Sequence, residues 1–183
     1  MADERERSLQ EFIDASEKTL VPPGGAVAFD ESVLRQPLSV LGPRRPIVVG
    51  PHVPVLEAIA LMQEARVGCV LVVHGGRLMG IFTERDVLIQ VVGRSLDAVK
   101  TPVRRLMTAD PESLRPTDSI AYALNAMSVG GYRHIPLVDE ARRPVGVVSV
   151  RDVINYLVRL FPKSVMNLPT LPRQNYARSR EGA

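Results

Sequence analysis

Apolar residues recur along the chain with two different periods, one typical of helices and the other of strands. In residues 54–66 and 118–129 they fall at spacings of three and four, which predicts two helices that each bury one face. Shorter apolar runs follow these helices, at 69–73, 78–82, 134–138 and 145–148. Runs this short, bounded by glycine, proline or charged residues, are typical of buried strands. The pattern therefore predicts a mixture of α and β elements.

The second half of this pattern repeats the first at an offset of 65 residues. Several residue types coincide under the shift: Pro37, Pro46, Pro51, Ala58 and Met62 meet Pro102, Pro111, Pro116, Ala123 and Met127. Gly80 and Gly146 lie 66 residues apart, which indicates one extra residue in the second hairpin. So many coincidences at one offset indicate an internal duplication of about 60 residues.

Each copy has the same order of predicted elements. A short extended segment at 47–49 or 113–114 precedes the helix, two strands surround a hairpin, and a last helix spans 84–92 or 150–160. The order β-α-β-β-α predicts an α+β unit with its helices on one face of a small sheet. A single unit of about 60 residues buries too little surface to be stable alone. We therefore expect the two units to pack sheet against sheet about a pseudo-two-fold axis.

The duplication divides the chain into four predicted segments. They are a partly helical N-terminal arm (1–36), a first unit (37–100), a second unit (101–161) and an extended basic tail (162–183). The arm carries a net charge of −4 and the tail a net charge of +3, within a total of +3. No basic run with interleaved aromatic residues occurs in the two units, so nucleic-acid binding by them is not expected.

Composition indicates which residue types form the core and which cellular compartment to expect. Tryptophan is absent and aromatic residues make up 4% of the chain, so the core must be aliphatic. Cys69 is the single cysteine, which excludes an internal disulfide framework and fits a reducing cytosol. Since it lies in an apolar run, we expect a buried and inert thiol rather than a nucleophile. The sequence has no apolar run of about 18 residues and no secretion signal, so we expect a cytoplasmic protein without a membrane span.

One nine-residue pattern occurs at the same place in both copies, where the last strand meets the last helix. Gly80–Leu88 and Gly146–Ile154 both contain glycine, two apolar residues, a hydroxyl residue, two variable residues, aspartate and two apolar residues. Ser or Thr followed three residues later by an acid is a helix-capping arrangement, which by itself accounts for the pair. A hydroxyl and a carboxylate at a helix N-terminus are also competent to bind a ligand, because the free N–H groups and the helix dipole favour anions.

These features resemble the cystathionine-β-synthase (CBS) domain family in its tandem form, the Bateman module. The resemblance is carried by the two Gly-h-h-Thr/Ser-x-x-Asp segments, the strand segments Cys69–Val73 and His134–Asp139, and the duplication itself, over about residues 37–161. Members of the family are mainly regulatory, bind adenosine compounds in clefts between the paired domains, and usually dimerise. Because no catalytic domain flanks the repeats, the resemblance implies a stand-alone CBS pair.

The resemblance implies two clefts, and we favour the one at the second motif. Its expected residues are Ser149, Arg151, Asp152, Arg133, His134, Ile47, Val67 and Gly68. The carboxylate of Asp152 would accept both ribose hydroxyl hydrogens, Ser149 would donate to the phosphate or the ribose, and Arg151 would contact the phosphate. The segments around Ile47 and Gly68 would flank adenine.

The first cleft has a different set of implied residues. They are Thr83, Arg85 and Asp86 with Gly68 and Cys69, joined by Tyr132 and Arg133 from the opposite copy. The second cleft is favoured because Arg133 and His134 stand where the first has Gly68 and Cys69, which gives it more groups for a phosphate. No second His, Cys or acid stands at ligand spacing from His134, so we expect no metal site.

Three functions remain open at this point. The leading hypothesis is regulatory binding of an adenosine nucleotide (AMP, ADP or ATP) or of S-adenosylmethionine, with no cofactor required. The alternatives are a protein-interaction module with vestigial clefts, and weak nucleic-acid binding through the arginines of the tail. No catalytic arrangement of Ser, His, Cys and Asp is present, so we expect no enzyme activity. The expected partners are an adenine nucleotide, a second copy of the chain through its exposed helices, and a regulated protein of unknown identity.

Overall fold

The computed structural model describes residues 31–93 and 96–161. The chain divides into two units, Met1–Val33 and Leu34–Ala183. The described part of the first unit is residues 31–33, which include the start of a short helix, α2 (Ser32–Arg35). Most of the predicted arm and all of the predicted tail therefore lie outside the described residues, and the fold and site below belong to the second unit.

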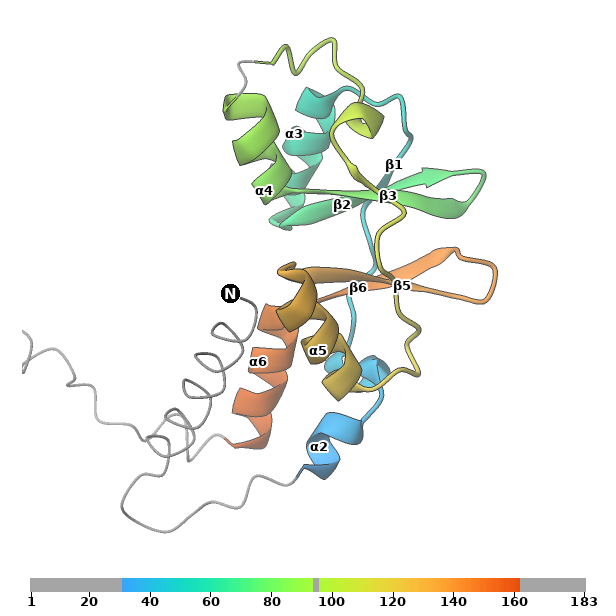
Figure 1. Ribbon diagram of the computed structural model, residues 1–183, viewed down its shortest axis with the longest axis vertical. Coiled ribbons are helices and arrows are strands. Elements are labelled where there is room, and N and C mark those ends of the chain that lie inside the picture. The colour runs from blue at the N-terminus through green and yellow to red at the C-terminus, as the bar shows by residue number, and fades with distance from the viewer. Residues whose placement is uncertain (1–30, 94–95, 162–183) are drawn as a thin grey trace, which may run out of the picture. The chain divides into compact units, whose positions relative to one another are not determined.

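The first copy of the repeat, together with one strand from the connection that follows it, forms a four-stranded sheet with two helices on one face (Figure 1). The strands run in the order β1 (Val48–Val49), β2 (Cys69–His74), β3 (Arg77–Thr83) and β4 (Thr108–Ala109). Strand β1 pairs parallel with β2, whereas the pairs β2–β3 and β3–β4 are antiparallel. The helices are α3 (Val55–Ala65) and a second one that begins as α4 (Glu84–Asp86) and continues as the π-helical turn η2 (Val87–Val92). The order β-α-β-β-α predicted for this copy is confirmed.

The second copy forms a smaller sheet of two antiparallel strands. The strands are β5 (His134–Val138) and β6 (Pro144–Ser149), and the helices are α5 (Ile120–Gly130) and α6 (Val150–Leu160). The first strand predicted at 113–114 is reduced to one parallel bridge between Leu114 and Leu137. In the first copy the N–H of Leu71 donates to the carbonyl of Ile47 at 2.9 Å. The equivalent residue here is Pro136, which has no N–H to donate, so the ladder cannot extend.

The first segment of each copy packs into the hydrophobic core of the other copy. The 3-10 turn η1 (Leu38–Leu41), which begins the first copy, packs into the second core with Ile120 and Ile135. The 3-10 turn η3 (Val103–Arg105), which begins the second copy, packs into the first core with Phe82. The predicted unit boundaries therefore follow the repeat in the sequence, whereas each core contains residues of both copies. A reciprocal exchange of this kind is what a pseudo-two-fold relation between the copies requires.

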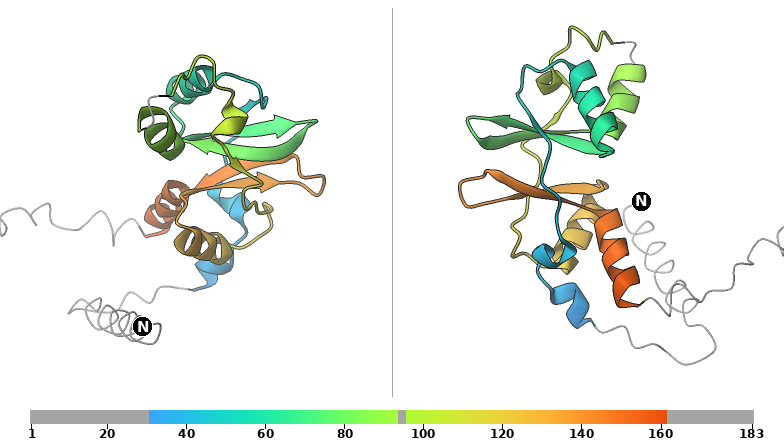
Figure 2. Two further views of the ribbon diagram at one scale, coloured as in Figure 1. Left: turned by 45° about the horizontal axis from the view of Figure 1, so that its top comes forward. Right: turned by 180° about the vertical axis from the view of Figure 1, so that it is seen from behind.

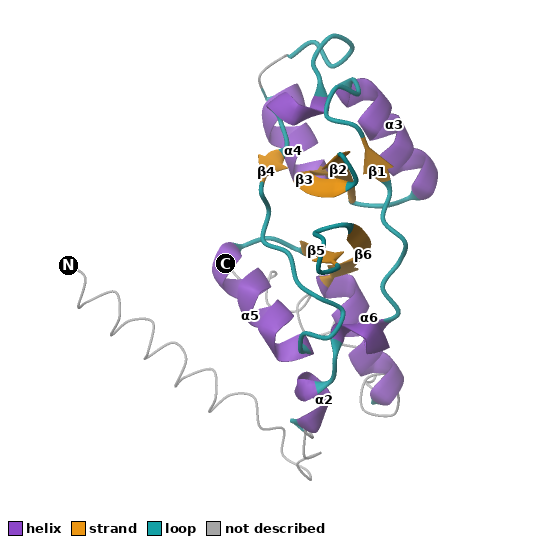
Figure 3. Ribbon diagram, turned by 90° about the vertical axis from the view of Figure 1, so that its right-hand side faces the viewer, coloured by secondary structure: helices purple, strands orange, loops and turns teal. Residues whose placement is uncertain are grey.

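The two sheets face each other, and both hairpins point to the same side (Figures 1 and 2). A small apolar cluster joins them, in which Leu71, Leu78 and Ile81 of the first sheet lie with Val138 and Val147 of the second. Helices cover the outer face of each sheet (Figure 3). The predicted packing of sheet against sheet is confirmed, and it brings the connections of one copy next to the motif of the other. No helix among residues 31–93 and 96–161 combines the length and the hydropathy that crossing a bilayer needs.

Candidate functional site

Both motifs form a capping box at the start of a helix. Thr83 ends β3, and its backbone N–H and its hydroxyl donate to Oδ2 of Asp86 at 2.9 and 2.7 Å. The N–H of Asp86 donates back to Oγ1 of Thr83 at 3.4 Å. Ser149 and Asp152 repeat the arrangement at the start of α6, with distances of 2.8, 2.7 and 3.3 Å. Helix capping therefore accounts for the motif in both copies, and it commits one carboxylate oxygen of each aspartate.

The other carboxylate oxygen differs between the copies. The amide Nε2 of Gln90 donates to Oδ1 of Asp86 at 3.3 Å and to the carbonyl of Leu106 at 2.8 Å. No described residue donates a hydrogen bond to Oδ1 of Asp152, because Tyr156 stands at the place of Gln90. The first aspartate is thus held through both oxygens, whereas the second keeps one acceptor available.

A cavity of about 370 Å³ lies beside the first motif. Three stretches of sequence supply its wall. The first copy contributes Gly68, Ile81, Thr83, Glu84, Arg85 and Asp86; the connection between the copies contributes Thr108, Asp110, Pro111 and Glu112; the second copy contributes Gly130, Gly131, Tyr132, Arg133 and His134. The stretches converge because the two sheets face each other.

This cavity contains every residue assigned to the first cleft except Cys69. Three residues that the sequence assigns to the favoured second cleft also line it, namely Gly68, Arg133 and His134. The remaining residues of the second cleft lie outside the lining: Ser149, Arg151, Asp152, Ile47 and Val67. At the first motif, Nη1 of Arg85 donates to the carbonyl of Gly131 at 3.2 Å and so joins the motif to the α5–β5 connection. The preference for the second cleft stays a prediction.

Cys69 lies behind the wall of the cavity. Its side chain is 6% exposed and packs between the sheets. Burial, and then the nearby carboxylate of Glu84, raise the pKa of the thiol to about 12. A protonated, buried thiol is a poor nucleophile and a poor ligand contact. Cys69 is not among the residues that line this cavity, and it has the buried position that the sequence indicated.

His134 lies between the two motifs. Its ring fills the space above Gly68, where an added Cβ would lie 2.9 Å from Cε1. Burial lowers the pKa of the imidazole and the neighbouring Arg133 lowers it further, whereas the carboxylates of Glu84 and Asp152 act in the opposite direction. The neutral imidazole is therefore favoured. Within residues 31–93 and 96–161 no three His, Cys, Asp or Glu side chains are grouped as a metal ion would need.

The sequence reasoning missed the wall formed by the connection between the copies. Glu112 accepts a 2.6 Å hydrogen bond from the hydroxyl of Tyr132, and Asp110 forms a 2.6 Å ion pair with Arg142. Burial, and then the bond to Glu112, raise the pKa of Tyr132 to about 12, so its hydroxyl stays protonated at neutral pH. Residues 108–112 have no apolar period. Only a residue-by-residue use of the 65-residue offset could have pointed to them.

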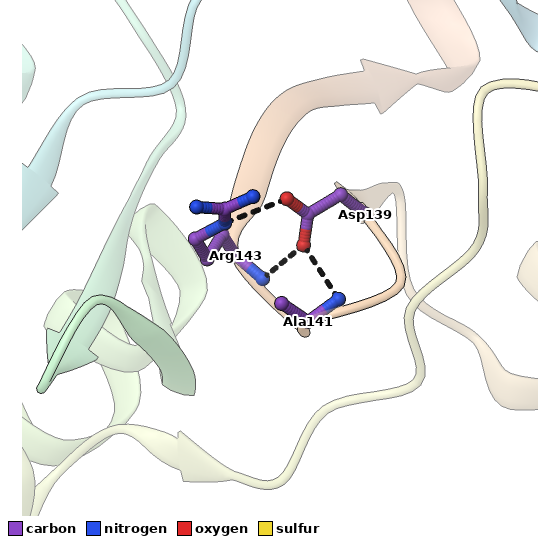
Figure 4. A network of polar contacts seen from close by, with 3 residues as sticks. All are labelled: Asp139, Ala141 and Arg143. Carbon is purple, nitrogen blue, oxygen red and sulfur yellow. Dashed lines mark hydrogen bonds and ion pairs between the residues drawn. The ribbon is translucent and has the colours of Figure 1, made fainter.

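A second carboxylate network closes the β5–β6 hairpin (Figure 4). Oδ1 of Asp139 accepts hydrogen bonds from the N–H groups of Ala141 and Arg143 at 2.9 and 2.8 Å, and Oδ2 accepts from Nε of Arg143 at 2.7 Å. These contacts, above all the backbone bond from Arg143, lower the pKa of Asp139. Asp139 lies outside the cavity lining. The network therefore stabilises the longer hairpin of the second copy and takes no part in the site.

Comparison with known sequences agrees with this geometry. The family model described as CBS domain matches residues 41–93 and 103–159, one match in each copy. A 17.7 kDa protein of Acidianus ambivalens is 33% identical over 112 residues, which are 61% of this chain and 66% of that protein. The chain spans between 14% and 66% of the length of the first curated relatives it matches.

Solved structures share the fold. A CBS-domain containing protein from Agrobacterium tumefaciens has a TM-score of 0.59 and 29% identity, with 66% of this chain and 94% of that chain covered. A CBS domain protein from Pyrobaculum aerophilum, complexed with AMP, has a TM-score of 0.61 and 25% identity, with 68% and 97% covered. The family matches cover more than half of the chain and fall on its two structural repeats, so this protein belongs to the CBS domain family.

Proposed function

We propose that the protein is a cytoplasmic regulatory module that binds an adenosine compound, an adenine nucleotide or S-adenosylmethionine, in the cavity beside the first motif. The observation that carries the proposal is that one cavity joins Asp86 and Arg85 of the motif with Tyr132 of the facing copy. A ligand held by both copies stabilises one arrangement of the two, which a partner protein can recognise. The proposed role is binding without a required cofactor, and no catalytic step is part of it.

The motif aspartate supplies the contact with ribose. Oδ2 of Asp86 belongs to the capping box, whereas Oδ1 accepts a bond of 3.3 Å from Gln90. A ribose hydroxyl replaces this long bond at little cost, because hydrogen bonds from a hydroxyl to a carboxylate are shorter and stronger. The ring of Tyr132, held by Glu112, offers a flat surface for adenine.

The family supports an adenosine ligand. The Pyrobaculum aerophilum protein, 25% identical to this chain, is complexed with AMP. We propose the second motif as a further half-site, because Oδ1 of Asp152 is available there. Its other members are Ser149, Arg151, Ile47 and Val67.

Titration calorimetry with AMP, ADP, ATP and S-adenosylmethionine tests the proposal. Asp86→Ala is expected to weaken binding by about tenfold or more, because a charge-assisted hydrogen bond to the ribose is removed. Asp139→Ala is the matched control, since it also removes a carboxylate that accepts backbone hydrogen bonds but lies outside the cavity. Binding of equal strength in Asp86→Ala and wild type would remove the site assignment. Failure of the wild type to bind any of the four compounds would remove the function.

A homodimer is the proposed assembly. The helix of the first motif exposes Leu88, Ile89 and Val92 at 66%, 52% and 67%, and α6 exposes Ile154, the counterpart of Leu88, at 53%. Apolar side chains on helices of both copies are suited to a self-complementary interface. Sedimentation of wild type and Leu88→Asp is the measurement. A dimer that persists unchanged in the variant contradicts this interface.

A further inference from the structure

We infer that the cavity beside the first motif selects an adenosine ligand whose 5′ substituent is uncharged or positively charged, and discriminates against a chain of phosphates. The inference rests on the proposed function and adds the chemical class of the ligand. It is drawn from the charged groups of the cavity wall, half of which lie outside the motif.

Acidic side chains outnumber basic ones in the wall. The acidic residues are Glu84, Asp86, Asp110 and Glu112, and the basic residues are Arg85 and Arg133. Arg142, which is not part of the wall, offsets Asp110 through an ion pair of 2.6 Å. The neutral imidazole of His134 adds no compensating charge. The wall therefore keeps an excess of negative charge.

Two of these carboxylates are hydrogen bonded by neutral groups alone. Asp86 accepts from Thr83 and from the amide of Gln90, and Glu112 accepts from the hydroxyl of Tyr132. Neutral donors satisfy the lone pairs of a carboxylate but leave its charge in place. Both groups therefore act on a bound ligand as full negative charges.

Glu84 is the least compensated of the carboxylates. No described residue donates a hydrogen bond to its side-chain carboxylate or forms an ion pair with it. Its Oε2 lies 3.5 Å from the position of a Cβ built on Gly68, at the cavity wall. The neighbouring Arg85 directs its guanidinium to the carbonyl of Gly131 at 3.2 Å. An added phosphate thus meets a carboxylate with no cation in contact with it.

The size of the cavity makes these charges effective at every point inside it. A volume of about 370 Å³ corresponds to roughly 9 Å across, which is no more than the Debye length of about 10 Å at 0.1 M ionic strength. A 5′ substituent that stays in the cavity cannot move beyond the range of the carboxylates. Each phosphate added to the ligand therefore raises the electrostatic cost of binding.

The duplication provides an internal comparison. At the offsets of the repeat, Glu84, Asp110 and Glu112 correspond to Val150, Arg45 and Ile47. The positions equivalent to these around the second motif thus hold apolar or basic residues. The acidic residues are therefore not a requirement of the repeat, and they distinguish the cavity wall at the first motif from the equivalent positions at the second.

Calorimetry compares S-adenosylmethionine and 5′-methylthioadenosine with AMP and ATP on the full chain. The proteins are wild type, E84Q, E112Q and the control E57Q. Each is also measured in combination with Asp152→Ala, which removes the contribution of the second motif to binding. Glu57 is exposed on α3 and lies outside the cavity wall, so E57Q removes the same charge elsewhere. Glutamine keeps the size and the acceptor oxygen of glutamate.

S-adenosylmethionine and 5′-methylthioadenosine are expected to bind about tenfold or more tightly than ATP, with AMP between them. E84Q and E112Q each reduce this ratio about threefold, and E57Q leaves it unchanged. ATP binding as tightly as S-adenosylmethionine in wild type overturns the selectivity and leaves the proposed function intact. An equal change in E57Q overturns the assignment to the cavity wall. Absence of binding for all four compounds overturns the proposed function together with the inference.

Discussion

The motifs Thr83–Asp86 and Ser149–Asp152 have the same local structure in different surroundings. Each forms a capping box with bonds that agree within 0.1 Å between the copies. A cavity lies beside the first motif, and the second motif lies outside its lining. The difference shows that the motif positions a carboxylate, whereas the residues brought to it from elsewhere in the chain decide what that carboxylate can bind.

The surroundings differ in three ways. Gln90 holds Asp86 where the second copy has Tyr156, and Glu84 stands where the second copy has Val150. The third difference is that the wall at the first motif includes the acidic connection between the copies, whose counterpart is basic and apolar. Variants at equivalent positions can therefore separate the role of the motif from the role of its surroundings.

Truncation of the two cores gives the largest expected difference between the copies. Phe82 and its counterpart Val148 are both fully buried. Phe82→Ala is expected to lower the free energy of unfolding by about 4 kcal/mol and Val148→Ala by about 2 kcal/mol, since the aromatic ring leaves the larger void. Urea unfolding measures both. Equal losses would contradict the assignment of Phe82 as the main aromatic group of the first core.

Removal of the capping carboxylates comes next. Asp152→Ala is expected to cost about 1 kcal/mol, because the capping box is lost. Asp86→Ala is expected to cost about 2 kcal/mol, because it also breaks the bond from Gln90 and leaves that amide without one partner. Chemical denaturation of both variants makes the comparison. A larger loss in Asp152→Ala would show that the second copy depends more on its cap.

The hydrogen bond from Gln90 to Asp86 can be removed without changing any residue of the motif. Gln90→Ala is expected to cost about 1 kcal/mol of stability, since it removes the bonds to Asp86 and to the carbonyl of Leu106. It also leaves Oδ1 of Asp86 without a donor among the described residues, as Oδ1 of Asp152 is in the second copy. Ligand affinity is expected to rise, because the ribose hydroxyl no longer has to displace Gln90 from this oxygen. Tyr156→Ala in the second copy is the matched control. A fall in affinity in Gln90→Ala would indicate that the amide itself contacts the ligand.

The smallest expected effect is a pH dependence of stability that depends on His134. Since burial lowers the pKa of this imidazole from its ordinary value of 6.5, the folded protein binds the proton less readily than the unfolded chain. The stability contributed by the neutral imidazole is complete above about pH 6.5 and is lost as the pH falls towards the lower pKa of the folded state.

Urea midpoints at pH 7.5 and pH 5 measure this dependence. The difference between the two is expected to be smaller in His134→Gln than in wild type. His74→Gln, at an exposed position in the β2–β3 hairpin, serves as the control. An unchanged difference in His134→Gln would contradict the role of burial at this residue.

Sequence reasoning reached the parts of the structure that depend on neighbours in the chain. The spacing of apolar residues predicted both helices and the central strands of each copy, and the hydroxyl and acid three residues apart predicted both caps. It overstated the strand at 113–114, because the pattern gave no weight to the missing N–H of Pro136. The apolar run around Cys69 indicated a buried thiol, which is confirmed, whereas the assignment of this residue to the first cleft stays a prediction.

The sequence by itself therefore determined the duplication, the order of elements, the capping boxes and the membership in the CBS domain family. The tertiary structure decided which segments share a core, which residues line the cavity beside the first motif, and that the connection between the copies forms part of its acidic wall. The physical reason is the separation along the sequence between the residues that interact. A capping bond joins residues three positions apart, whereas the contacts that shape the site join Arg85 to Gly131 and Asp110 to Arg142, 46 and 32 positions apart. Only the packing of the two sheets brings these groups together.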